Sequence, residues 1–375
     1  MRDIPPAAVL GIDIGGANIK YALIGRNEFL DSEHTISDQI LTAPSVIFPM
    51  WKLHQQLSEQ LVNDLLKMPI SNLIGCGITM TGELADCYFD REQGVTQIVQ
   101  HVKTACDTLH LPRPLFYAVD GRFRTSIECL GHEDLLAASN WHGLAQYLAS
   151  TCFPDGTLID IGSTTTDIIP IRHGKVVTSA RTDFDRLCEG SLVYVGGERT
   201  SVSMVVDSLE YQGHCCPVMR EHFATTKDIR VILGLMPESD DDYDTADGKP
   251  RTLRYSTNRL ARVIGRSGRE ITKDDSIHLA RQIHQTVQAR IQDGLRQVEN
   301  LYGTTEKYLI SGHNDDLVPF DGDSPRQYLR DVIGVQGSRN APAVAVAGLL
   351  SKTLDTEHHD LPNGAMGLPD RGEVQ

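Results

Sequence analysis

Two segments of the chain repeat one pattern: an apolar residue, Asp, an apolar residue, Gly and a small residue, followed by a second β-like run. The first copy spans residues 11–20 and the second spans residues 158–167. A strand that stops at Gly and reverses presents consecutive N–H groups, which form a concave anion site. One copy would be weak support, because any tight strand turn favours Gly. Two copies, one in each half, predict two loops that hold one polyphosphate from opposite sides.

The aspartate before each turn has a predicted chemical role. Asp13 and Asp160 occupy the same place in the two copies. A carboxylate and a phosphate are both negatively charged, so neither aspartate is expected to contact a phosphate directly. We expect Asp13 and Asp160 to be ligands, direct or through water, of a Mg²⁺ ion. The alternative is an Asp that only caps its own turn. Lys20 follows the first turn and either contacts a phosphate oxygen or is a solvated strand lysine.

The residues of the two turns are the predicted phosphate contacts. Four consecutive hydroxyl side chains in the second turn would satisfy phosphate oxygens well, although the same residues could form an ordinary strand edge. The predicted contacts are Gly15, Gly16, Ala17 and Asn18 in the first turn, and Gly162, Ser163, Thr164, Thr165 and Thr166 in the second.

Composition limits the class of partner. A chain of 375 residues is long enough for two domains. The net charge of −15 makes nucleic acid or an anionic membrane surface an unsuitable partner. No window is apolar over the length of a membrane span, and Asp13 interrupts the apolar N-terminus, so we expect no signal peptide. Eight cysteines without a paired framework predict reduced thiols in a cytoplasmic protein. The expected partners are small molecules.

The pattern of apolar residues predicts alternating strands and helices. In the first half we expect strands over 9–14, 19–24, 28–36, 72–80 and 114–119, and helices over 51–68, 95–109 and 133–149. In the second half we expect strands over 175–178, 191–195 and 307–311, and helices over 275–301 and 340–354. The predicted domains are 1–153 plus 338–354 and 154–337, with a boundary near 150–156 and a disordered tail from 355 to 375.

The two turns together resemble the phosphate motifs of the actin, sugar-kinase and heat-shock ATPase superfamily. That resemblance implies an α/β fold of two actin-like (ribonuclease H-like) domains that face each other across a phosphate-binding cleft. The superfamily's third motif, an adenosine-side strand and Gly turn, would be residues 308–314 here. His313 follows Gly312 where a second Gly is usual, so a side chain would intrude on a bound purine.

The same resemblance suggests where a catalytic base lies. In sugar kinases and related ATPases, the carboxylate that acts as base or positions the water follows an apolar strand of the first domain. Glu83 and Asp86 occupy that region here. The mechanism needs a carboxylate that faces the nucleophile across the phosphates, and these two are the candidates. The alternative is that both are loop carboxylates in solvent.

A narrower resemblance, to one branch of the hydantoinase and oxoprolinase family, covers roughly residues 9–350 and several motifs. Its bacterial members are called tetrahydromethanopterin-linked one-carbon-transfer proteins, and its archaeal member is a synthase of methanofuran biosynthesis. Besides the two turns, the matching motifs are residues 79–87, 138–142, 194–200, 223–228 and 245–248. The polar clusters at 199–200, 222–228 and 244–248 are candidates for a substrate pocket because of their place in the second domain, although by composition alone each would be a solvated face. The candidate substrate-binding residues are Thr81, Asn140, Arg199, Thr226, Lys227, Asp247, Gly312 and His313.

The branch implies a transferase with a diphosphate leaving group. Its synthase joins an aminomethylfuran-methyl diphosphate to the phenol of a γ-glutamyl-tyramine-type acceptor. Two anion-binding turns and Mg²⁺ suit a departing diphosphate. The alternatives are an ATP-dependent hydantoinase or oxoprolinase-like hydrolase and a non-catalytic nucleotide-binding module, both of which require nucleotide binding. ATP binding, a tyramine or tyrosine acceptor, and the oligomeric state are left open by the sequence.

Overall fold

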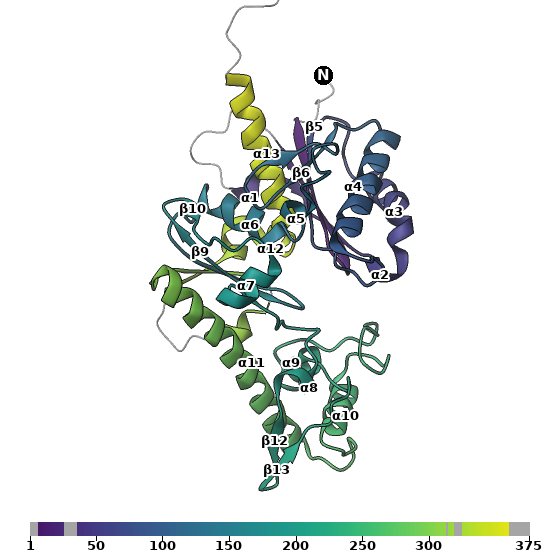
Figure 1. The fold of residues 1–375 in the computed structure, drawn as a ribbon. Helices are drawn as coiled ribbons and strands as arrows, with labels where there is room; N and C mark the ends of the chain where they lie inside the picture. Colours follow the sequence, from purple (N-terminus) through teal and green to yellow (C-terminus); the bar gives the residue numbers. More distant parts are fainter. Residues whose placement is uncertain (1–6, 26–35, 313, 319–324, 360–375) are drawn as a thin grey trace, which may run out of the picture. The chain divides into compact units, whose positions relative to one another are not determined.

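The computed structural model describes residues 7–25, 36–312, 314–318 and 325–359, which form two α/β units (Figure 1). Within these residues, the first unit consists of 7–25, 38–143 and 342–359, and the second consists of 36–37 and 144–341. The change of unit falls inside helix α6 (Asn140–Ala149), slightly before the segment 150–156 where the sequence placed the boundary. No described helix is long and apolar enough to cross a membrane.

The sheet of the first unit is built around a parallel centre. Its strand order is β3-β2-β1-β5-β6-β7, with β4 also paired to β2. β1 pairs in parallel with β5, and β5 pairs in parallel with β6, whereas β1 and β2 form an antiparallel hairpin. The strands are β1 (Ala8–Ile14), β2 (Asn18–Gly25), β3 (Ile40–Thr42), β4 (Ser45–Ile47), β5 (Leu73–Met80), β6 (Pro114–Tyr117) and β7 (Phe123–Arg124).

Helices cover both faces of this sheet (Figure 1). Leu10, Ile12 and Ile14 alternate along β1 and join the core with helices α3 (Leu57–Leu65) and α4 (Arg91–Thr108). The opposite face carries glycines against α13 (Ala341–His359): a Cβ at Gly11 would lie 2.0 Å from the backbone oxygen of Ala343. Asp13 has the same parity as Gly11 and therefore projects from the α13 face.

The second unit repeats this hairpin-plus-parallel-strand arrangement. Its order is β10-β9-β8-β14-β15, with β11 also paired to β9. Helix α11 (Lys273–Tyr302) packs on one face through its apolar stripe. The strands are β8 (Gly156–Ile161), β9 (Thr166–Arg172), β10 (Lys175–Val176), β11 (Leu192–Val193), β14 (Tyr308–Gly312) and β15 (Arg326–Tyr328), and a separate ribbon joins β12 (Ser208–Tyr211) to β13 (His214–Pro217).

The remaining elements are short connections and helices. They are α1 (Ile36–Gln39), α2 (Met50–Leu53), η1 (His54–Gln56), α5 (Glu133–Leu136), α7 (Asp183–Glu189), α8 (Val202–Val205), α9 (Thr226–Ile232), α10 (Leu253–Val263), η2 (Asp315–Leu317) and α12 (Leu329–Arg339).

Most predicted elements are present, and three differ. The helix expected over 51–68 is divided among α2, η1 and α3, and the one over 133–149 is broken into α5 and α6. Ala138 causes the second break, because its φ of 46° is left-handed and its N–H donates to the Glu83 carboxylate at 2.9 Å. The tail was expected to be disordered from Asp355, but α13 continues to His359. The strand expected over 28–36 lies largely outside the described residues.

Candidate functional site

The two predicted turns have the same internal geometry. In the first, the N–H of Gly15 donates to the carbonyl of Asn18 at 3.0 Å. In the second, the N–H of Gly162 donates to the carbonyl of Thr165 at 2.9 Å. The aspartates precede the turns at equivalent register positions, since Asp13 pairs with Lys20 and Asp160 pairs with Asp167 across their hairpins. The duplicated sequence pattern therefore folds into a duplicated structure.

Neighbouring segments donate hydrogen bonds to the carbonyl groups of the first turn. Both Thr81 and Gly82 donate their N–H to the carbonyl of Ile14 at 2.9 Å, which brings the candidate Thr81 to the turn. The carbonyls of Gly16 and Ala17 accept at 2.9 Å from the N–H groups of Met50 and Phe48. By contrast, the N–H groups of Gly16 and Ala17 donate no hydrogen bond to any group in the described part of the chain. The turn thus offers donors without competing acceptors.

The second turn shows the same division of its backbone groups. The carbonyl of Gly162 accepts from the N–H of Gly197 at 3.0 Å, and that of Ser163 accepts from residues 198 and 199 at 3.0 and 2.9 Å. The Asn314 amide donates to the carbonyls of Ile161 and Gly162, both at 2.9 Å. Among residues 7–25, 36–312, 314–318 and 325–359, none accepts from the N–H of Ser163 or Thr164. Such unpaired N–H groups at a bend suit an anion.

Gly196 and Thr166 hold the second turn in place. A Cβ at Gly196 would lie 2.5 Å from the backbone nitrogen of Thr164, so only glycine allows this approach. The Thr166 hydroxyl is fully buried and donates to the carbonyl of Val195 at 2.8 Å. In this arrangement Thr166 stabilises the loop, and its expected contact with phosphate stays a prediction. The side chains of Ser163 and Thr164 remain partly exposed.

Asp13 is a buried carboxylate, and one of its two oxygens forms an ion pair with Lys20. Its side chain is 3% exposed, and Oδ2 lies 3.5 Å from Nζ of Lys20. Within the described chain Oδ1 receives no hydrogen bond. Burial raises the pKa of Asp13, and the charge of Lys20 opposes that rise. A buried carboxylate oxygen with no donor fits a hydrated cation, which supports the predicted Mg²⁺ role without testing it.

Asp160 has a different electrostatic setting. Its cross-strand neighbour is another carboxylate, Asp167, whereas the neighbour of Asp13 is a lysine. Arg186 of α7 is buried and donates to Asp167 Oδ1 at 2.6 Å, and it also donates to the carbonyl of Ser191 at 2.9 Å. No cluster of three or more His, Cys, Asp or Glu side chains suited to a metal occurs among the described residues. A shared Mg²⁺ ligand set therefore stays a prediction.

The two candidate bases have very different surroundings. Glu83 is 1% exposed, and its Oε1 accepts the N–H of Ala138. Its backbone lies against α4, where a Cβ at Gly94 would be 2.1 Å from the Glu83 carbonyl oxygen. The alternative of a solvated loop carboxylate is therefore wrong for Glu83, whereas Asp86 is exposed. Which of them acts as a base stays a prediction.

Three candidate residues of the second unit belong to an internal polar network. Thr226 donates its hydroxyl to the carbonyl of Gly196 at 2.8 Å. Lys227 is buried and donates to the carbonyl of Asp244 at 2.9 Å, with the Asp242 carboxylate at 3.5 Å. Asp247 accepts from Arg259 at 2.8 Å. This network holds the motifs 194–200, 223–228 and 245–248 together beside the second turn.

The other candidates are partly exposed or outside the described residues. Arg199 is exposed beside the second turn, and Asn140 is half-buried at the start of α6, where its Oδ1 accepts the N–H of Trp141 at 2.7 Å. Gly312 has a φ of 86°, and a Cβ there would lie 2.3 Å from the carbonyl oxygen of Ile161. That glycine is therefore required by strand packing. His313 lies outside the described residues.

Sequence reasoning missed Arg186, Arg230 and Asn314 as supports of the second turn. Arg230 donates to Asn314 Oδ1 at 2.6 Å and to Asp316 at 2.7 Å. Asn314 in turn donates to the carbonyls of the second turn. The available sequence signal was an arginine beside a polar motif. The acceptors of these arginines, Asp167, Asn314 and Asp316, are not adjacent in the sequence, so the pairing could not be predicted.

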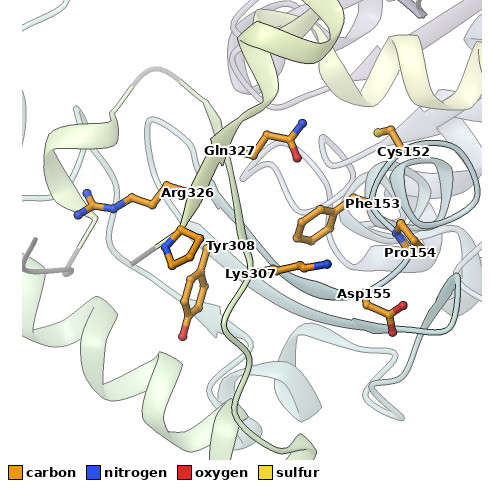
Figure 2. Close-up of a pocket in the computed structure, with 9 residues that line it drawn as sticks. Cys152, Phe153, Pro154, Asp155, Lys307, Tyr308, Arg326 and Gln327 are labelled. Atoms are coloured by element: carbon orange, nitrogen blue, oxygen red, sulfur yellow. The ribbon is translucent and has the colours of Figure 1, made fainter. Parts of the chain in front are cut away.

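A hollow of about 370 Å³ lies elsewhere in the second unit (Figure 2). Its lining residues precede or begin the parallel strands β8, β14 and β15, so it lies at the end of these strands away from the turn after β8. Figure 2 shows Phe153, Lys307 and Gln327 on one side of β15, with Arg326 directed to the other. The hollow is therefore separate from the second turn.

Two α/β units, each with an Asp–Gly turn between antiparallel strands beside a parallel strand, define the two-domain actin-like fold. A nucleotide-free structure of acetone carboxylase shares the fold, with a TM-score of 0.50, 10% identity, and coverage of 92% of this chain and 70% of that one. Component A of (R)-2-hydroxyglutaryl-CoA dehydratase from Acidaminococcus fermentans aligns with a TM-score of 0.44, 12% identity, and coverage of 93% and 99%.

The chain belongs to the hydantoinase/oxoprolinase family, whose profile matches residues 75–312. It is 34% identical over 353 residues to the (4-{4-[2-(γ-L-glutamylamino)ethyl]phenoxymethyl}furan-2-yl)methanamine synthase of Methanocaldococcus jannaschii, covering 92% of this chain and 98% of that protein. It is also 33% identical over 174 residues to the synthase of the same name from Methanococcus vannielii, covering 46% of this chain and 78% of that protein.

Proposed function

We propose that this protein is a transferase that joins an aminomethylfuran-methyl group, supplied as its diphosphate, to a tyramine- or tyrosine-type phenol and releases diphosphate. The observation that carries the proposal is the 34% identity to the Methanocaldococcus jannaschii synthase over 98% of its length. That protein's name describes a furan joined through a phenoxymethyl link to a glutamylated phenethylamine. The reaction belongs to the biosynthesis of a methanofuran-type one-carbon carrier, linked in bacteria to tetrahydromethanopterin.

The proposed reaction exchanges one carbon–oxygen bond for another. The bond between the methylene carbon and the diphosphate oxygen breaks, and its electron pair leaves with the diphosphate. The phenol oxygen bonds to that carbon, and its proton passes to a carboxylate, Glu83 or Asp86. The furan stabilises positive charge on the methylene carbon, so the protein mainly has to position the substrates and stabilise the leaving group.

The two turns supply the donors that this leaving group requires. The N–H groups of Gly16, Ala17, Ser163 and Thr164 have no acceptor within the described chain and are held by bonds to the carbonyls around them. Donors fixed before the reaction stabilise developing charge without reorganisation. Mg²⁺, held by Asp13 and Asp160 in this proposal, would offset the charge of the diphosphate. We propose a cytoplasmic location, which eight cysteines without a paired framework support.

The test supplies purified protein and Mg²⁺ with the furanmethyl diphosphate and γ-glutamyl-tyramine. We expect diphosphate and the phenoxymethyl product in equal amounts, measured by a coupled diphosphate assay and mass spectrometry. A parallel reaction contains ATP in place of the furan diphosphate. Steady ATP hydrolysis without any ether product would overturn the proposal in favour of the hydrolase.

A further inference from the structure

The internal repeat of the structure extends beyond the two turns. In the first unit β4 pairs with β2, so that Val46 is opposite Ile19 and Ile47 is opposite Asn18. In the second unit β11 pairs with β9 in the same way, and Val193 is opposite Thr166. The offset that relates Asp13 to Asp160 also relates Ile47 to Tyr194. Both positions carry large exposed side chains, with Ile47 81% and Tyr194 65% exposed.

Tyr194 is held firmly beside the second turn. Val193 pairs with Thr166, the residue that ends the turn, and the Thr166 hydroxyl donates to the carbonyl of Val195 at 2.8 Å. The N–H of Val195 donates to the carbonyl of Val193 at 2.8 Å, which closes a tight bend centred on Tyr194. Leu192 and Val195 are buried, so the bend exposes the one aromatic ring of this segment.

We propose that the ring of Tyr194 stacks on the furan of the donor substrate and is a specificity-determining residue. This inference rests on the proposed function. The bend adjoins the turn whose N–H groups would bind the diphosphate, because Val193 pairs with Thr166 and Gly196 approaches the backbone of Thr164. Only one methylene separates the furan from the diphosphate, so the ring of a bound donor can reach Tyr194. Furan is flat and apolar with a π face, which an aromatic side chain recognises by stacking. Tyrosine also loses few rotamers when it orders on a ligand.

Comparing two ligands separates the contribution of the furan ring to affinity from that of the phosphates. Inorganic diphosphate has no ring, so its binding does not depend on Tyr194. Stacking between an aromatic side chain and a flat ligand ring is worth roughly ten- to a hundredfold in affinity, or about 1.4–2.8 kcal/mol. The phenol hydroxyl is not required for stacking.

The experiment compares dissociation constants for the furanmethyl diphosphate and for inorganic diphosphate in the full chain with Mg²⁺. We expect Tyr194→Ala to weaken binding of the furan compound by about ten- to a hundredfold and to leave diphosphate binding within about twofold. Tyr194→Phe retains the ring and both affinities. The control Tyr243→Ala removes another exposed tyrosine, on the loop 238–248, and changes neither.

Two results would overturn the assignment of Tyr194. One is an unchanged ratio of the two affinities in Tyr194→Ala. The other is a raised KM for the phenol alone, which would place the acceptor at this ring. Both require that the wild-type protein forms product. A wild-type protein that forms none refutes the proposed function instead, so the two failures are distinguishable.

Discussion

At the scale of one residue, Asp13 shows that the candidate site contains a group whose burial lowers stability. Burial raises the pKa of this carboxyl, so between its ordinary and its raised pKa the folded state binds more protons than the unfolded state. The free energy of unfolding therefore falls as pH rises through that window. Above the raised pKa, the cost of holding a buried carboxylate is fully present.

We therefore predict that Asp13→Asn abolishes turnover but leaves the thermal unfolding midpoint at pH 7 unchanged or higher. Lys20, which would lose its partner, is 31% exposed and stays solvated. The measurement is turnover against Mg²⁺ concentration together with thermal unfolding. Asp107→Asn, at an exposed ion pair with Lys103, is the control. Full turnover with unchanged Mg²⁺ dependence would contradict the assignment.

A second residue-scale prediction concerns the proton of the phenol. Glu83→Gln preserves an oxygen that can accept the N–H of Ala138, so a loss of rate would report the charge rather than the fold. We expect Glu83→Gln or Asp86→Asn, whichever removes the base, to slow turnover about a hundredfold or more. A free phenol has a pKa of about 10, so a more acidic fluorinated phenol should reduce the damage. Equal rates in both variants and wild type would exclude a carboxylate base here.

At the scale of elements, the docking of α13 depends on glycine. Gly11→Ala would place a methyl group 2.0 Å from the carbonyl oxygen of Ala343, and neither β1 nor the helix backbone can move freely. We expect the free energy of unfolding to fall by about 1–3 kcal/mol or more. Gly16→Ala is the matched control, because its Cβ would meet nothing within 4 Å. Chemical denaturation of both variants checks this, and equal stability would show that α13 shifts to accommodate the methyl.

The elements that the sequence predicts well are those with local signals. The hairpins follow from the duplicated Asp-apolar-Gly pattern, and α11 follows from its apolar stripe. The break at Ala138 could not be predicted, because its cause is a hydrogen bond to Glu83, 55 residues earlier. The turns are a second case. Their free N–H groups are predictable from the local sequence, but the donors to their carbonyls come from segments remote in the sequence. Arg186 carries no motif and gains its role only from the fold beside Asp167.

At the scale of the whole molecule, the two units share one strand arrangement but differ in the charge opposite the aspartate of each hairpin. The first hairpin opposes Asp13 to a lysine, and the second opposes Asp160 to a carboxylate that Arg186 holds. Each unit offers N–H donors at its turn and an exposed side chain beside it. A single small diphosphate cannot use both turns unless the units bring them to one ligand.

The last prediction tests whether both units serve one ligand. If Asp13 and Asp160 act on a single Mg²⁺–diphosphate complex, losing either destroys most of the site, so the effects of the two substitutions are not additive. We expect Asp13→Asn and Asp160→Asn each to weaken Mg²⁺-dependent diphosphate binding strongly, and the double variant to bind little worse than the weaker single variant. Titration calorimetry of the wild type and the three variants measures this. Additive losses in free energy would mean that the two turns bind independently and that no ligand is shared.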